Sequence, residues 1–386
     1  MIQQNICLVD FSDQVYQVNS LYTKALLRPQ LNLLYLATAL ASRGNLVTVV
    51  CSQEQAFKDG SIQFLPHPED PERFWGKALY DIVICLNSLQ GSTDIRPYLP
   101  EQIPMILWST LVSQHIAMLG LRHSQVQQAF RAFVVENHMF AQAYVDAFEI
   151  DASRTHYRWP GMIRTLRKRF STIEELKKAR NPHLTLLFCS DPLIGLAPTL
   201  DIYRRLKVDY PELVLKILLK PGFEWQQSPV ALQNLIQEAK QTPGVEVHDP
   251  MPWPAFAEAL LGCHVLCSPL AFNEPYWAEL IDPLSAGCQA VLCRHSDLQL
   301  VSVPEIHWIE PEPADSYFER YIAAIKKLLD QCQTETDKFF EVSLEQIANF
   351  NTLYTWDLRV WEWESLFFRY TREPAFITTT ESVESL

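Results

Sequence analysis

The sequence is poor in glycine and has no long hydrophobic run, and both absences exclude functions. Only 11 of its 386 residues are glycine, and no Gly-x-Gly-x-x-Gly follows a predicted strand, which argues against a NAD-dependent oxidoreductase. The longest apolar runs fall well short of the roughly 20 residues that a membrane-spanning helix needs. The formal net charge is −13, so nucleic acid is not an expected partner.

The cysteines do not form a disulfide or metal-binding pattern. There are nine of them, an odd number, and most lie in apolar, strand-like stretches. This is typical of reduced, buried thiols in a cytoplasmic protein. Cys263 and Cys267 have Cys-x3-Cys spacing, but no second Cys/His pair with suitable spacing follows, and we expect no metal. No basic segment precedes the first strand-like residues, so we also expect no secretory signal.

The length of the chain predicts two domains, because 386 residues exceed what one hydrophobic core usually organises. Predicted strands and helices alternate in two series, over 1–165 and over 183–350, and such alternation forms parallel sheets. Between them we expect a linker at 166–182. A terminal helix at 351–373 and a flexible tail at 374–386 complete the predicted organisation.

The first series opens with a strand–helix–strand unit. Residues 5–11 predict a strand, 28–44 a helix with apolar residues at helical spacing, and 46–51 a second strand. The loop 12–20 between the first strand and the helix contains no glycine. We therefore expect no tightly cradled phosphate there, since close backbone approach to a phosphate favours glycine.

A loop rich in proline and aromatic residues, followed by a short helix, occupies 268–287. The helix is predicted to end at Gly287, where glycine adopts positive φ at little cost. Glu274 and Asp282 are eight residues apart, which suits two ends of an extended ligand better than an acid/base pair acting on one atom. From the residues alone, a solvated loop glutamate and a surface aspartate are equally good interpretations.

This segment resembles the donor-binding signature of retaining glycosyltransferases with the GT-B fold, within them the family-4 group. That signature has Glu-Pro-aromatic, then a second acid, usually Glu, with seven residues between the two acids, and then a small-Gly pair. The resemblance implies that Glu274 contacts hydroxyls of the donor sugar, and that Asp282 contacts the nucleotide ribose. It also places Asn273 in the donor-binding loop. The matching residues of this chain are Glu274, Pro275, Tyr276, Asp282, Ala286 and Gly287.

As architecture, the resemblance covers nearly the whole chain. It implies an α/β GT-B fold, with two Rossmann-like domains whose parallel sheets face each other across a cleft. The amino-terminal domain would bind the acceptor, the carboxy-terminal domain the nucleotide sugar, and a C-terminal helix would cross back to the first domain. Trp356 stands at that helix's usual Trp, and Gly161 at a turn on the rim of the cleft. Helical spacing puts Trp356, Val360, Trp363 and Phe367 on one face, which we expect to pack rather than to stack on sugars.

The usual diphosphate contacts of the family are missing. Relatives normally use an Arg and a Lys after the first strand of the second domain, without a metal, whereas this chain has Ser190 and Ile194 there. Asp191 beside them would repel phosphate. Lys220, at the end of the next strand, and Arg294, after the strand that follows the signature, are our replacement candidates. Their alternative interpretations are a surface residue at a strand end and a loop salt bridge.

A second catalytic candidate comes from the loop after the predicted strand 104–110. The family commonly presents a His from this loop toward the reacting sugar. In this chain Leu111 lies near that place and His115 follows a few residues later. Our hypothesis is that His115 reaches the cleft from a longer loop, with an ordinary surface histidine as the alternative.

The stretch 163–182 is rich in Arg and Lys and contains a predicted capped helix that starts at Ser171 or Thr172. We favour a solvated helix face for these basic residues. Because many relatives act on membrane acceptors, a weak peripheral contact with anionic lipid, worth about 1 kcal/mol per residue, is the second interpretation.

Two functions remain open. The main hypothesis is a glycosyltransferase of class EC 2.4 that moves a sugar from a UDP- or GDP-sugar to an unknown hydroxyl acceptor, with retention of configuration. It would need no cofactor beyond this donor. The alternative is a non-catalytic GT-B-like binding or scaffold protein that has lost donor turnover, because both basic residues and the Gly-rich loops are missing.

Overall fold

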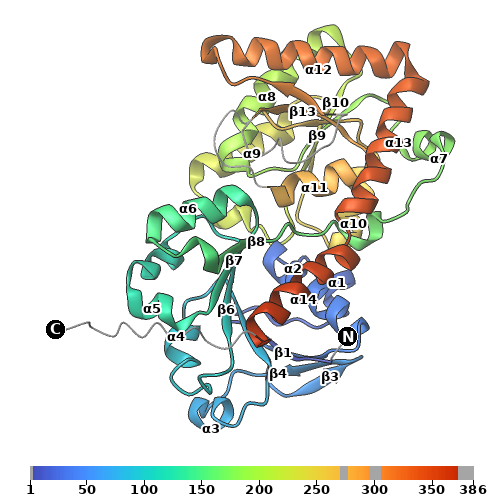
Figure 1. The fold of residues 1–386 in the computed structure, drawn as a ribbon. Helices are drawn as coiled ribbons and strands as arrows, with labels where there is room; N and C mark the ends of the chain where they lie inside the picture. The colour runs from blue at the N-terminus through green and yellow to red at the C-terminus, as the bar shows by residue number, and fades with distance from the viewer. Residues whose placement is uncertain (1–2, 270–276, 295–305, 373–386) are drawn as a thin grey trace, which may run out of the picture.

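The computed structural model describes residues 3–269, 277–294 and 306–372. Figure 1 shows two α/β halves stacked one above the other, the amino-terminal half in blue and green and the carboxy-terminal half in light green to orange. Within the described ranges, no helix is both long and apolar enough to cross a membrane.

The amino-terminal half is built on an eight-stranded sheet with the order β3-β4-β2-β1-β5-β6-β7-β8. Every neighbouring pair is parallel except β3 and β4. Its central strands are continuous apolar runs, as expected for strands buried on both faces. The strands are β1 Asn5–Asp10, β2 Leu46–Val50, β3 Phe57–Asp59, β4 Ile62–Leu65, β5 Ile82–Leu86, β6 Met105–Ser109, β7 Ala132–Val135 and β8 Thr155–Tyr157.

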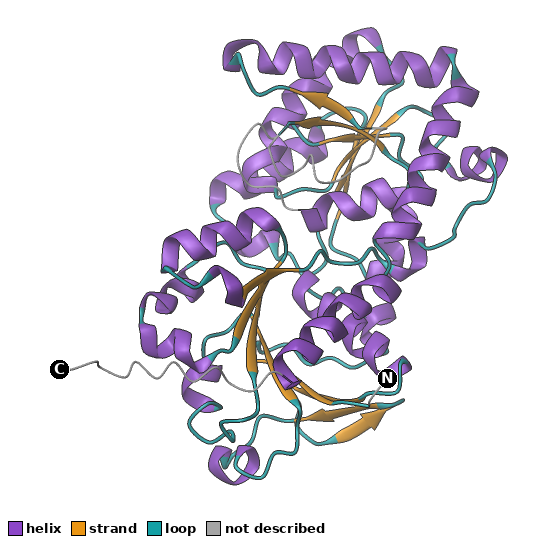
Figure 2. Cartoon of the chain, viewed as in Figure 1, coloured by secondary structure: helices purple, strands orange, loops and turns teal. Residues whose placement is uncertain are grey.

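Helices cover both faces of this sheet (Figure 2). Two of them start at a side-chain cap. The Asp70 side chain accepts from the N–H of Arg73 at α3, and the Asn137 side chain accepts a hydrogen bond of 2.8 Å from the N–H of Phe140 at α6, which begins shortly after β7. The helices of this half are α1 Ser20–Thr23, α2 Arg28–Ser42, α3 Pro71–Trp75, α4 Gly91–Asp94, α5 Ser124–Ala129 and α6 His138–Phe148.

The carboxy-terminal half holds a six-stranded, all-parallel sheet with the order β11-β10-β9-β12-β13-β14. The direction of strand succession reverses between β9 and β12, which is the topological switch point of a doubly wound sheet. The strands are β9 Thr185–Phe188, β10 Val214–Leu218, β11 Val245–His248, β12 Val265–Cys267, β13 Gln289–Cys293 and β14 His307–Ile309. The helices are α8 Pro192–Asp209, α9 Val230–Gln241, α10 Trp253–Leu261, α11 Trp277–Ser285 and α12 Tyr317–Thr334.

The chain passes between the halves twice. On the way out, α7 (Ile173–Ala179) has a capping box in which Thr172 and Glu175 bond each other's backbone, so the predicted cap at Thr172 is confirmed. On the way back, α13 (Thr336–Leu353) descends along the second half, and α14 (Trp356–Arg372) packs beside α2 (Figure 1). The crossing back to the first half is thus confirmed.

The apolar face of α14 packs against the first half. Trp356, Val360, Trp363 and Phe367 are all buried, whereas Trp361 is 50% exposed. The rings of Trp363 and Trp108 lie 4.9 Å apart and those of Trp356 and Tyr35 5.7 Å apart. The predicted packing role of this face is therefore confirmed.

Further local predictions hold as well. Gly287 follows α11 with a φ of 78°, the left-handed backbone for which glycine was expected. All nine cysteines are buried. The structure also shows why residue 161 is a glycine: a Cβ there would lie 2.7 Å from the Trp356 indole.

Candidate functional site

A cavity of about 190 Å³ lies between the two halves. Thr110 and Glu136, just beyond β6 and β7, line it from the first half, and Asp191 and Lys220, beyond β9 and β10, line it from the second. The carboxyl ends of strands from both sheets thus meet at one place, where doubly wound folds bind their ligands. This cavity is the candidate functional site.

Lys220, which was predicted to contact the donor phosphate, lines the cavity. It lies two residues beyond the end of β10. Burial lowers its pKa to about 8, against the opposing effect of Asp191, while Arg28 pushes in the same direction as burial. An ammonium group held in poorly hydrated surroundings attracts an anionic ligand more strongly than one in water.

Asp282, the second predicted residue in the cavity, is 2% exposed. One carboxylate oxygen pairs with the guanidinium of Arg28, and the other accepts a hydrogen bond of 2.9 Å from the N–H of Ile163. Burial raises its pKa, and Arg28 works against that rise. The side chain that the resemblance assigns to ribose therefore ties α11 to the first half.

Arg28, at the first position of α2, was missed by sequence reasoning. Its guanidinium also donates to the carbonyl of Gly161 at 2.9 Å and lies 5.4 Å from the centre of the Trp253 ring. A cation in the first turn of a helix is opposed by the helix dipole. That mismatch between Arg28 and its helix position was the signal available in the sequence.

Glu136 was also missed. It is 6% exposed and lines the cavity between the end of β7 and the cap residue Asn137. Burial raises its pKa to about 7, although the positive charges of Arg28 and Lys220 lower it. A carboxyl group with such a pKa exchanges its proton near neutral pH. A glutamate directly after an apolar strand was the sequence signal for it.

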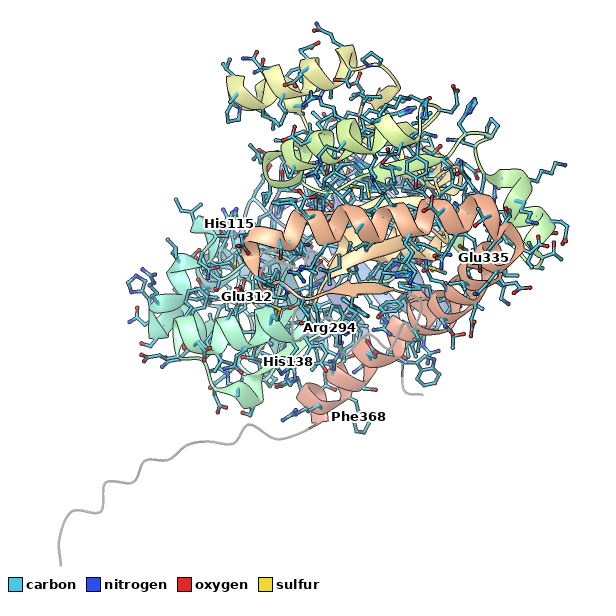
Figure 3. All side chains as sticks on the ribbon, turned by 90° about the horizontal axis from the view of Figure 1, so that it is seen from above. His115, His138, Arg294, Glu312, Glu335 and Phe368 are labelled. Atoms are coloured by element: carbon cyan, nitrogen blue, oxygen red, sulfur yellow. The ribbon has the colours of Figure 1, made fainter. Side chains whose placement is uncertain are left out.

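His115 and Arg294 lie elsewhere. His115 is exposed, and its Nδ1 accepts a hydrogen bond of 3.2 Å from the N–H of Ala117. The Arg294 Nε lies 2.8 Å from a carboxylate oxygen of Glu310, the salt bridge named as its alternative interpretation. Neither residue lines the cavity between the halves, and Figure 3 shows the two well apart.

Four predicted donor-binding residues lie outside the described residues: Asn273, Glu274, Pro275 and Tyr276. Their chain leads directly into α11, the helix that carries Asp282 into the cavity.

The positions of the missing cations carry no positive charge. Ser190 is buried, with its hydroxyl 3.3 Å from that of Ser268, and Ile194 is 43% exposed. Asp191 caps α8 by accepting a hydrogen bond of 2.9 Å from the N–H of Leu193. Within the part of the chain that the structure describes, no group of three or more His, Cys, Asp or Glu side chains is arranged to hold a metal ion.

Several basic residues near the crossing segment have acidic partners within the chain. Arg167 pairs with Asp357, and Arg169 with Glu258. The buried Arg180 donates to the carbonyls of Leu261, Ala286 and Gly287. The peripheral membrane contact stays a prediction.

No protein-family model and no curated protein matches the sequence. Solved structures do match. Sucrose-phosphate synthase from Thermosynechococcus elongatus aligns with a TM-score of 0.68 and 12% identity, over 95% of this chain and 99% of that chain. The catalytic domain of starch synthase IV from Arabidopsis thaliana, bound to ADP and acarbose, gives 0.65 and 9%, over 96% and 100%. Anabaena HepE in complex with UDP-glucose gives 0.63 and 13%, over 94% and 100%.

At these identities the likeness shows the fold. Together with the two parallel sheets and the returning α14, it confirms the predicted α/β GT-B architecture, which is the fold of these glycosyltransferases.

Proposed function

We propose that the protein is a glycosyltransferase that moves a sugar from a nucleotide-sugar donor to a hydroxyl acceptor with retention of configuration. The observation that carries the proposal is the cavity between the halves, where Arg28, Lys220 and Asp282 meet at the carboxyl ends of strands. The fold is one that the solved glycosyltransferases share, but fold alone does not establish an activity. The two cations of the cavity, Arg28 and Lys220, are what support a diphosphate-bearing donor there.

In this proposal Lys220 and Arg28 hold the donor diphosphate in place of the missing Arg and Lys. When the bond from the sugar C1 to the diphosphate oxygen breaks, its electron pair leaves with the diphosphate. Fixed cations stabilise the charge that develops there. The acceptor hydroxyl oxygen forms the new bond to C1, and its proton passes to the departing diphosphate oxygen. Arg294, at the end of β13, is the further phosphate candidate, and it would exchange Glu310 for the donor.

The remaining roles follow from the family resemblance. Glu274 contacts the sugar hydroxyls, with Asn273, Pro275 and Tyr276 shaping its loop, and Asp282 contacts the ribose. One oxygen of Asp282 pairs with Arg28 and the other accepts from the N–H of Ile163, and in this proposal the ribose hydroxyl takes the place of Arg28. Displaced in this way, Arg28 becomes available to the diphosphate. For His115 the resemblance is the only support, because the side chain is exposed outside the cavity.

The test starts with calorimetric titration of the full chain with UDP, GDP, ADP and their glucose conjugates. We expect the protein to bind one of these three nucleotides and to turn over the corresponding nucleotide sugar. Glu274→Gln should then reduce transfer far more than it reduces nucleotide binding, with Glu341→Gln, an exposed glutamate of α13, as the matched control. Equal losses of transfer and binding in Glu274→Gln would refute its catalytic role.

The second candidate function is a non-catalytic nucleotide-sugar binding or scaffold protein. It is favoured by Ser190 and Ile194 at the positions of the family's phosphate-binding cations. Binding of a nucleotide sugar without transfer or hydrolysis would support it. No response to any nucleotide at millimolar concentration would overturn the donor site altogether.

A further inference from the structure

The charges around the cavity do not suit a diphosphate as they stand. Two cations face it against three carboxylates, so within the described residues the fully ionised cavity carries an excess of negative charge. Burial keeps the pKa of the Cys189 thiol well above its ordinary value, so this lining residue is neutral. The charged groups are Arg28 of α2, Lys220 after β10, Glu136 after β7, Asp191 at the start of α8 and Asp282 of α11.

The three carboxylates differ in what their protonation would break. Asp282 would lose its ion pair with Arg28 or its bond from Ile163, and Asp191 would weaken the cap of α8. The Glu136 carboxyl receives no hydrogen bond from the residues that the structure describes and interacts with Arg28 and Lys220 only through charge. Protonating Glu136 therefore removes one negative charge at the smallest structural cost.

We infer that Glu136 takes up a proton when the diphosphate of the donor enters the cavity, and that its carboxylic acid then donates a hydrogen bond to a phosphate oxygen. The inference rests on the proposed function and adds a donor ligand from the half that binds the acceptor. Its physical basis is that a carboxylate and a phosphate cannot both stay ionised side by side in poorly hydrated surroundings. Donor binding is thus coupled to proton uptake.

The pKa of Glu136 sets where this coupling appears. With that pKa at about 7 in the empty cavity, the acid is already protonated below neutral pH, and binding there needs no proton. Above it, each bound donor takes up as much as one proton, and affinity falls by up to about tenfold per pH unit. Lys220 has a pKa of about 8, so its loss of charge causes a second fall in donor affinity, which begins roughly one pH unit higher.

The test is calorimetry of the full chain with UDP-glucose and GDP-mannose between pH 6 and pH 9, in two buffers of different ionisation enthalpy. Both phosphates of these probes are esterified, so the ligand itself does not titrate near pH 7. We expect the wild type to take up a substantial fraction of a proton at pH 7.5. Glu136→Gln, which keeps a hydrogen-bond donor and removes the charge, should take up little, and its affinity should stay level until Lys220 titrates.

Glu341→Gln serves as the control and should titrate like the wild type. Binding by the wild type without proton uptake, or a Glu136→Gln variant that keeps the wild-type uptake at pH 7.5, would overturn the inference and leave the proposed function intact. Failure of every nucleotide and nucleotide sugar to bind at any pH would overturn the proposed function, and this inference with it. A melting curve of each variant separates loss of binding from loss of fold.

Discussion

Both sheets have a switch point, where the direction of strand succession reverses. The switch point of the first sheet is filled by side chains, whereas that of the second sheet opens onto the cavity. The carboxyl end of β1, between β2 and β5, is closed by the protein itself. Asp10 is 2% exposed, and it accepts hydrogen bonds from the hydroxyl of Tyr16 at 2.8 Å, the amide of Gln30 at 3.0 Å and both donors of Ser12. The carboxyl end of β9, between β10 and β12, opens onto the cavity through Asp191.

This difference assigns unequal tasks to the halves. In the proposed function, the second half uses its switch point for the ligand, as doubly wound sheets do. In the first half, the switch point is filled by the hydrogen-bonded network around Asp10, which we expect to stabilise the fold. That half reaches the cavity instead with Arg28 from α2, Thr110 just beyond β6 and Glu136 just beyond β7. Changes at Asp10 should therefore act on stability, and changes at Lys220 on binding.

The largest effect is expected from Asp10→Ala. The variant removes the acceptor of the buried Tyr16 hydroxyl and one of the two acceptors of the Gln30 amide, whose other acceptor is the Ser12 hydroxyl. Buried donors left without an acceptor cost about 1 to 3 kcal/mol each. We expect the free energy of unfolding to fall by about 3 kcal/mol, measured by urea denaturation, while nucleotide affinity at 25 °C stays near that of the wild type. The exposed Asp13 gives the control Asp13→Ala, which should change little. Loss of nucleotide affinity in a folded Asp10→Ala protein would contradict the assigned tasks.

Lys220→Met should produce the converse result. It removes a half-buried cation that faces the diphosphate in the proposed function, so the dissociation constant of the bound nucleoside diphosphate should rise about 30-fold, or about 2 kcal/mol. Stability should be kept, because a partly desolvated ammonium is exchanged for an apolar side chain of similar length. Lys240, an exposed lysine of α9, supplies the matched variant Lys240→Met. Equal affinities of Lys220→Met and Lys240→Met would remove Lys220 from the site.

Glu136→Gln should change the stability of the protein by a smaller amount, and the change should depend on pH. The pKa of Glu136 rises from 4.5 to about 7 on folding, so its ionisation favours the unfolded chain, and stability is lost as pH rises from about 4.5 through about 7. Above that range the variant should be more stable than the wild type by about 1 kcal/mol, since the amide must still be buried. Melting at pH 5 and pH 8 checks this: the gain should appear at pH 8 and shrink at pH 5. A variant that is equally destabilised at both values would contradict the assigned burial cost.

Much of the fold was predictable because its elements carry strong local patterns. The apolar runs of β1, β5 and β9 and the helical periodicity of α2 are properties of short stretches, and Gly287 marks a helix end by its own chemistry. The short strands β3, β4, β8 and β14 were missed because none of them is a continuous buried run like the four residues of β9. The predicted terminal helix over 351–373 is in fact the end of α13, a break at Tyr354 and α14.

The site was predictable only where a sequence motif or a strand end marked it. Lys220 and Asp282 were predicted on separate grounds, and the fold brings both to one cavity. Arg28 and Glu136 belong to no recognised motif. Their relevance arises from tertiary structure, since α2, β7, α8 and α11 converge there although they are far apart in the sequence.

The most direct test of the proposed donor site is a crystal structure of the full chain grown with UDP. The account predicts that the diphosphate lies in the cavity between the halves, in contact with Lys220 and Arg28, with the ion pair between Arg28 and Asp282 opened. A nucleotide bound elsewhere, or an empty cavity with that ion pair intact at saturating UDP, would contradict it.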